Sequence, residues 1–146
     1  MIDRVDKEIL KLLQQNGRLS LKTIAEKTFL SSPAVSARIE RMENDGIILG
    51  YEAKVSPIRM GYHILAYINL NVQPEDKNKF YKYAESIPKI LECSSVTGEY
   101  SVIMKAAFES TMKLDTFLGQ LQKFGKTSTQ IVFATHVGPR GIQIQE

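Results

Sequence analysis

The sequence has very few of the residues that build metal and disulfide sites. Its 146 residues include one cysteine, Cys93, two histidines, His63 and His136, and no tryptophan. A lone cysteine cannot form an internal disulfide, and these three residues do not have the spacing of a zinc site. We therefore expect no disulfide, no metal and no cofactor.

Long hydrophobic runs are also absent. No apolar stretch approaches the roughly 20 residues that a membrane-spanning helix requires, although 43% of the residues are hydrophobic. The first eight residues carry five charged side chains, which is unlike a secretory leader: Asp3, Arg4, Asp6, Lys7 and Glu8. We expect a soluble, cytoplasmic protein without a membrane partner.

Neither sign of charge dominates, and no catalytic group is evident. The chain has 19 Lys and Arg against 16 Asp and Glu, a net charge of +3. This excess is too small to indicate nucleic-acid binding, and only a clustering of positive charges on one face would indicate it. Neither histidine has a clear nucleophile or acid partner, and we expect that the protein is not an enzyme.

Three short helical patterns occupy the first part of the chain. Each begins near a candidate N-cap, Asp3, Ser20 or Ser32. The third pattern has Pro33 at its first helical position and Gly46 just past its end. The first pattern repeats apolar side chains at helical spacing: Val5, Ile9, Leu12 and Leu13. We predict three helices, the second of them short.

The third helix has two different faces. Val35, Ile39 and Met42 form a narrow apolar stripe that must pack on the other helices. An ordinary solvated face would explain the opposite arc. However, a short preceding helix, a tight turn and small exposed residues fit a helix-turn-helix, whose second helix enters the major groove of DNA. The opposite arc and its flanks contain Pro33, Ser36, Ala37, Arg38, Glu40, Arg41 and Asn44.

A change of pattern separates this unit from the rest of the chain. Residues 47–57 are rich in β-forming residues and predict a strand, a wing-like addition to the three helices. Pro57 and Gly61 mark a linker. We predict a DNA-binding domain at residues 1–55, a linker at 56–61 and a second domain at 62–146.

The second domain alternates strands and helices. Strands are predicted at residues 63–72, 90–96, 100–108 and 129–137, and helices at 74–87 and 110–124. The order strand, helix, strand, strand, helix, strand is the split βαβ pattern. It predicts an α+β, ferredoxin-like domain with a four-stranded antiparallel sheet and both helices on one face.

Several motifs together resemble one protein family. The chain contains D-x-x-D-x-x-I-L, then R-x-x-x-M-E-x-x-G-I-I-x-G-Y, then T-G-E-Y. This combination resembles the leucine-responsive/asparagine regulators, the Lrp/AsnC or feast/famine family. The resemblance implies an N-terminal winged helix-turn-helix and a ferredoxin-like (ACT-like) domain. That domain would dimerise through its sheet, assemble dimers into octamers or similar rings, and often sense amino acids.

The resemblance also implies DNA-contacting residues. The helix-turn-helix proper would span Lys22 to Arg41, with the recognition helix beginning at Ser32 and Arg38 matching a recurring arginine of the family. Ser31 and Ser32 provide small donors and acceptors for phosphates or base edges. The DNA-binding candidates are Lys22, Ser31, Ser32, Pro33, Ser36, Ala37, Arg38 and Arg41.

An effector pocket is implied between dimers, around the turn at Gly98. The family commonly has an aspartate three residues after this glycine, where this chain has Ser101. A hydroxyl holds an ammonium group far less strongly than a carboxylate does, and only Glu99 could replace it. We therefore expect weak or no binding of aliphatic amino acids. The candidates are Gly98, Glu99, Tyr100, Ser101, Thr127 and Thr129.

The sequence is compatible with three functions to different degrees. The first is a sequence-specific transcription regulator, and the second is an architectural protein of the same fold that wraps DNA without an effector. The third is an enzyme or stand-alone amino-acid sensor on the C-terminal fold. The absence of a catalytic constellation and the presence of the N-terminal helices argue against the third.

Overall fold

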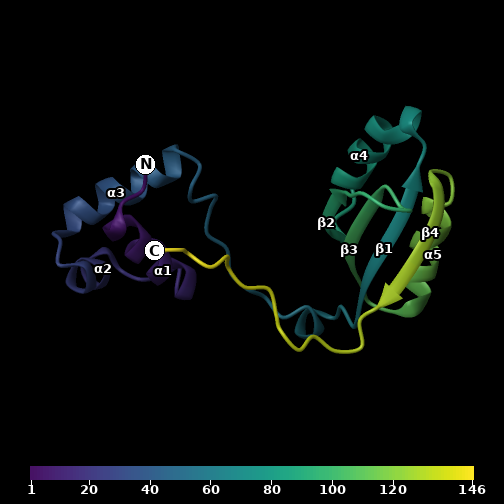
Figure 1. Cartoon of the computed structure of the whole chain (residues 1–146). Coiled ribbons are helices and arrows are strands. Elements are labelled where there is room, and N and C mark those ends of the chain that lie inside the picture. Colours follow the sequence, from purple (N-terminus) through teal and green to yellow (C-terminus); the bar gives the residue numbers. More distant parts are fainter. The chain divides into compact units, whose positions relative to one another are not determined.

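A computed structural model describes all 146 residues. The chain forms two compact units (Figure 1), of which the first combines Met1–Lys54 with Gly138–Glu146 and the second comprises Val55–Val137. No helix in either unit is long and apolar enough to cross a membrane.

The N-terminal unit contains the three predicted helices, α1 (Arg4–Gln15), α2 (Leu21–Thr28) and α3 (Ser32–Asn44). The N-caps of α1 and α2, Asp3 and Ser20, are confirmed. The predicted N-cap of α3 is wrong by one residue. Ser31 has an extended backbone and its hydroxyl accepts a hydrogen bond from the Ala34 N–H, whereas Ser32 is already helical.

The helices enclose a small apolar core. The stripe predicted on α3 points inward, with Val35 and Met42 fully buried and Ile39 half-buried. The other helices contribute buried residues to the same cluster: Ile9, Leu10, Ile24 and Ala25. This packing fixes which face of α3 is turned outward.

The strand predicted at residues 47–57 is not formed. The N–H groups of Ile47 and Ile48 both donate to the Met42 carbonyl, which continues the turn after α3. Leu49 is exposed, and the segment runs without strand pairing through Ser56. A β-rich composition forms a strand only beside a partner, and no strand lies beside this segment in the chain.

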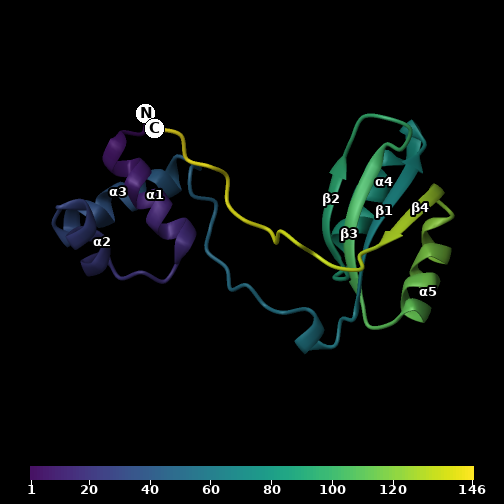
Figure 2. The ribbon, with the colours of Figure 1, turned by 60° about the horizontal axis from the view of Figure 1, so that its bottom comes forward.

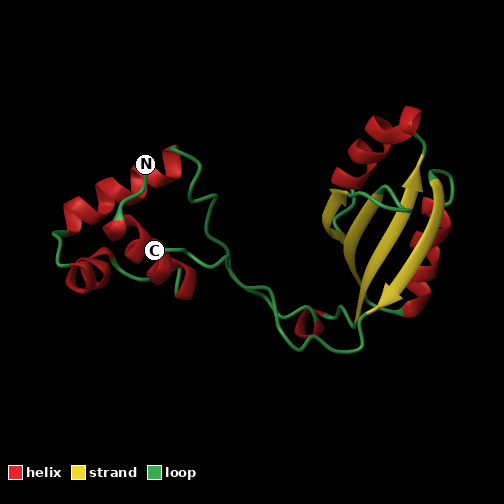
Figure 3. Cartoon of the chain, viewed as in Figure 1, coloured by secondary structure: helices red, strands yellow, loops and turns green.

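The C-terminal unit has the predicted order of elements: β1 (Ile64–Val72), α4 (Lys77–Glu85), β2 (Ile90–Ser95), β3 (Val102–Phe108), α5 (Thr111–Leu121) and β4 (Gly125–Ile131). Short 3-10 turns lie at Ile58–Met60 and Pro74–Asp76. The strands form one antiparallel sheet in the order β2-β3-β1-β4. Figure 3 shows the sheet with its helices, and the ferredoxin-like fold is confirmed.

The alternation of β1 determines which face of the sheet is covered. Ala66, Ile68, Leu70 and Val72 are buried, as the period of two predicts. They share one core cluster with residues of both helices, including Phe80 of α4 and Phe117 of α5. Both helices therefore pack on the same face of the sheet.

The last strand begins and ends earlier than predicted. β4 starts at Gly125, where a side chain is excluded because a Cβ would lie 1.9 Å from the Asn71 carbonyl oxygen. Pairing with β1 ends near Val132, whose N–H donates to the Leu65 carbonyl. β1 itself begins at Ile64, so the remaining predicted strand residues have no partner, and Phe133 is fully exposed.

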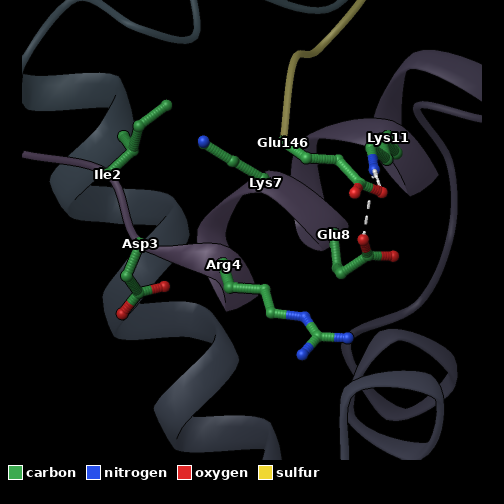
Figure 4. A pocket seen from close by; sticks show the side chains of 7 residues that line it. All are labelled: Ile2, Asp3, Arg4, Lys7, Glu8, Lys11 and Glu146. Atoms are coloured by element: carbon green, nitrogen blue, oxygen red, sulfur yellow. Dashed lines mark hydrogen bonds and ion pairs between the residues drawn. The ribbon is translucent and has the colours of Figure 1, made fainter.

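The C-terminal tail, Gly138–Glu146, belongs to the N-terminal unit, whereas the sequence predicts it in the second domain at residues 62–146. Both chain termini lie in this unit (Figure 2). Ile144 packs against the helical core, and Gly141 lies so close to Gln14 that a Cβ there would be 2.5 Å from its Nε2. The last residue, Glu146, lies beside Lys11, with 3.9 Å between Oε1 and Nζ (Figure 4).

Candidate nucleic-acid interface and ligand-binding domain

The α2 and α3 helices are joined by a tight turn. The α2 helix ends at Thr28. The next residue, Phe29, adopts a left-handed backbone with φ of 57°, and the Leu30 N–H donates to the Ala25 carbonyl. Ser31 then caps α3. A short helix, a turn of this length and a longer second helix make up a helix-turn-helix, which places the outward face of α3 where it can meet a groove.

Small side chains lie together on this outward face. Pro33, Ser36 and Ala37 are exposed, and Ser32 is half-buried at the start of the helix. Lys22 is exposed in the first turn of α2. All eight predicted DNA-binding residues thus lie on α2, α3 or the turn between them, and two of them, Arg38 and Arg41, differ from the rest in direction. The other six are Lys22, Ser31, Ser32, Pro33, Ser36 and Ala37.

The two arginines of α3 are placed differently from the sequence-based expectation. The sequence pattern predicts Arg38 and Arg41 on the arc opposite the apolar stripe and its flank, but both side chains turn toward the first turn of α1. Arg38 Nη1 lies 2.7 Å from Asp3 Oδ2 and 2.8 Å from Asp6 Oδ1. Arg41 Nη2 lies 2.6 Å from Asp6 Oδ2, and its Nη1 donates to the Met1 carbonyl at 3.2 Å.

Asp6 is the centre of this cluster and the one charged residue of the chain that is fully buried. Its burial by itself would raise the pKa. The Asp3 N–H and the guanidinium groups of Arg41 and Arg38 outweigh that effect and lower the pKa to about 2. The Asp6 N–H and the Arg38 guanidinium lower the pKa of Asp3, and the carboxylates of Asp3 and Asp6 raise the pKa of Arg38. The cluster therefore stays ionised at neutral pH.

The sequence pattern does not identify Asp6 as the partner of Arg38 and Arg41, although the position of Asp6 on α1 indicates that it needs a cation. Asp6 lies three residues before Ile9, so it shares the inward face of α1 with a core residue. A carboxylate on an apolar face requires a cation. The sequence therefore shows that Asp6 needs a partner, but it does not identify that partner as α3.

Comparison with known proteins agrees with this arrangement. Residues 2–48 match the family model "Winged helix-turn-helix DNA-binding", and residues 65–142 match "Lrp/AsnC ligand binding domain". The second match alone covers more than half of the chain. The chain belongs to the Lrp/AsnC family.

Relatives of known sequence and structure extend this Lrp/AsnC assignment over nearly the whole chain. The HTH-type transcriptional regulator FL11 of Pyrococcus furiosus is 32% identical over 143 residues, which cover 93% of this chain and 92% of the relative. The structure of Escherichia coli AsnC has a TM-score of 0.88 at 28% identity and covers 97% of this chain and 98% of its own. The transcriptional regulator NMB0573 of Neisseria meningitidis, solved as an L-Met complex, has a TM-score of 0.89 at 25% identity. The match covers 96% of this chain and 94% of that structure's chain.

The predicted effector residues of this Lrp/AsnC chain lie on both sides of β1. Ser101 precedes β3, and its hydroxyl accepts from the Val72 N–H at 3.0 Å and donates to the Leu70 carbonyl at 3.4 Å. Thr127 of β4 pairs with Leu70 from the other side, and Thr129 pairs with Ile68.

The remaining predicted effector residues form the turn before Ser101. Gly98 has φ of 112°, a conformation that glycine adopts readily. Glu99 is exposed, and Tyr100 is half-buried. The turn and the two threonines thus approach the same part of the sheet from opposite sides of β1.

Proposed function

We propose that this Lrp/AsnC chain is a DNA-binding transcription regulator that inserts α3 into the major groove. The observation that carries the proposal is the outward face of α3, where Pro33, Ser36 and Ala37 are small and exposed. Small side chains allow the helix backbone to approach the base edges closely. The relationship to HTH-type regulators such as FL11 supports the same function.

Each candidate has a role that follows from its position. Lys22 would neutralise a phosphate, since it is exposed in the first turn of α2. Ser31 and Ser32 would donate to phosphate oxygens at the N-terminus of α3, where the helix dipole also favours an anion. Pro33, Ser36 and Ala37 would lie against base edges. The apolar side chains of Pro33 and Ala37 would contact thymine methyl groups.

The C-terminal unit would supply assembly and sensing. We propose a homodimer through the sheet, assembled further into an octamer or another ring of dimers. Such a dimer would place two recognition helices on half-sites about 34 Å apart, or a multiple of that distance. We also propose a small-molecule effector at the turn around Gly98. The L-Met complex of NMB0573 supports an amino acid or a related compound as its chemical class.

Replacing Ala37 by glutamate tests DNA binding through α3. Ala37→Glu puts a charged, larger side chain on the proposed DNA face, so its affinity for a duplex selected by the wild-type protein should fall at least tenfold. Ala134→Glu makes the same charge change at an exposed residue after β4 and should bind like wild type. Fluorescence anisotropy with full-length variants measures both. Equal affinities for Ala37→Glu and wild type would contradict insertion of α3.

The same titrations separate a regulator from an architectural protein. A regulator prefers the selected duplex over random sequence, because base contacts add to the phosphate contacts. An architectural DNA-wrapping protein binds both duplexes alike, since phosphates and DNA shape dominate its affinity. A ratio near one between the two dissociation constants would favour the architectural function.

A further inference from the structure

The carboxylate of Asp6 connects the first turn of α1 to α3. It accepts a hydrogen bond from the Asp3 N–H at 2.9 Å, and Asp3 in return accepts from the Asp6 N–H. Its Oδ1 also accepts a hydrogen bond from Arg38 Nη1 at 2.8 Å, and its Oδ2 accepts one from Arg41 Nη2 at 2.6 Å. One buried anion therefore holds two arginines that lie almost one helical turn apart on α3.

Burial makes this attachment difficult to release. A buried carboxylate that loses its cation remains as an uncompensated charge in a medium of low dielectric constant. Drawing Arg38 or Arg41 onto a DNA phosphate would weaken the compensation of Asp6, whose side chain has no exposure to water. Each arginine would exchange a partner at hydrogen-bond distance for a solvated phosphate.

The outward face of α3 is left without a cation. Its exposed residues include Pro33, Ser36, Ala37 and Glu40, and Glu40 carries a negative charge. The two arginines are the only basic residues of α3, and both point toward α1. Positive charge for the phosphates must then come from other elements, such as Lys22 on α2.

We infer that Arg38 and Arg41 are positioning residues, which fix the orientation of α3 on α1 through Asp6 and do not bind DNA phosphates. This inference rests on the proposed function, because it concerns how the recognition helix is held while it reads DNA. A helix held by two guanidinium groups on one carboxylate cannot roll about its axis without breaking a hydrogen bond. The ion pairs thereby keep the small residues of the outward face directed toward the groove.

Removing the charge of Asp6 separates the two roles, because they predict opposite changes. If the arginines bind phosphates, Asp6→Asn releases them and raises the affinity for any duplex. If they position α3, Asp6→Asn lowers affinity for the selected duplex at least tenfold and leaves affinity for random duplex unchanged. Fluorescence anisotropy of the full chain, with both duplexes at several salt concentrations, measures these affinities.

The salt dependence and a conservative variant provide independent readouts. Each phosphate contact adds about 0.9 to the slope of log K against log salt. We expect that slope to be unchanged in Arg41→Lys and Arg38→Lys, with at least tenfold weaker binding of the selected duplex, because lysine lacks the fork of donors. Lys22→Gln is the contrasting variant, and its slope should decrease by about one.

Circular dichroism and thermal unfolding check that each variant is folded. If Asp6→Asn is unfolded at the assay temperature, the two lysine variants decide, since they keep the net charge. Full affinity in both lysine variants, or a slope lowered by about one in Arg41→Gln, would overturn the inference. Failure of the proposed function is seen separately, as unchanged binding by Ala37→Glu.

Discussion

Ser101 is the residue at which this chain departs from the aspartate expected by resemblance to its family. Its hydroxyl is engaged in both directions, since it accepts from the Val72 N–H and donates to the Leu70 carbonyl. A hydroxyl in this arrangement holds the turn against β1, and it carries no charge with which to hold an ammonium group. The position is therefore built as a structural contact in the chain.

We predict that aliphatic amino acids such as leucine bind weakly, and that Ser101→Asp gains such binding. A charge-assisted hydrogen bond contributes about 1.5 to 3 kcal/mol, which corresponds to roughly ten- to a hundredfold in affinity. Thermal-shift measurements with the twenty amino acids test this, because a ligand at a hundred times its dissociation constant stabilises by about 2.7 kcal/mol.

The control for this experiment adds the same charge elsewhere in the turn. Thr97 is exposed, and Thr97→Asp should leave amino-acid binding unchanged. Micromolar binding of leucine by the wild-type protein would disprove the prediction. If such binding persisted in Glu99→Gln, compensation by Glu99 would be disproved as well.

The role of a single residue is predictable from the sequence where that residue acts within its own helix or strand. Asp3 and Ser20 were predictable N-caps because the capping interaction lies within three residues along the chain. The directions of Arg38 and Arg41 were not predictable in this way. Periodicity places a residue on a helix face, whereas the partner of a long flexible side chain depends on how α1 and α3 pack.

At the scale of elements, the turn between α2 and α3 is locally strained. Phe29 has a positive φ, which is unfavourable for a residue with a bulky side chain, and that side chain is 95% exposed. The left-handed conformation costs an L-residue roughly 1 to 2 kcal/mol. The aromatic ring does not recover this cost by burial in the chain.

We predict that Phe29→Gly stabilises the N-terminal unit. Relief of the left-handed strain is partly offset by the greater freedom of glycine in the unfolded chain, which leaves a gain of about 0.5 to 1 kcal/mol. Hydrogen exchange of the α2 and α3 amides in the full chain reports the free energy of opening of this unit.

The matched control replaces a glycine that has positive φ by a residue with a side chain, just after the end of α3. Gly46 has φ of 71° with open space around it, so Gly46→Ala introduces backbone strain and no collision. We expect it to destabilise by about 1 kcal/mol. Unchanged or faster exchange in Phe29→Gly would show that the turn is not strained.

The elements themselves were largely predictable, and the errors concern strands. The alternation in β1 identified its buried face because the period of two is a property of any strand. The strand predicted at residues 47–57 and the position of β4 were wrong for one reason. A strand is defined by its partner, so β4 is set by its register with β1, and an apolar run without a partner is not a strand.

At the scale of the whole chain, the last nine residues complete the helical unit. They follow the C-terminal sheet in sequence but contact α1, where Gly141 lies close to Gln14 and Glu146 lies beside Lys11. Sequence reasoning could not find this, because the tail is short and lacks periodicity. A single apolar residue, Ile144, packs against the helical core.

We predict that Ile144→Ser destabilises the N-terminal unit and that Ile142→Ser does not. Full burial of an isoleucine contributes about 1.5 to 3 kcal/mol, and Ile144 is only half-buried, so we expect a loss of about 1 kcal/mol. Ile142 lies in the same tail and is 79% exposed, so Ile142→Ser is a control that makes the same chemical change at an exposed position. Hydrogen exchange of the α1 amides measures both variants. Equal exchange in the two would mean that the tail does not contribute to the stability of the unit, and removal of residues 138–146 should then also leave α1 unchanged.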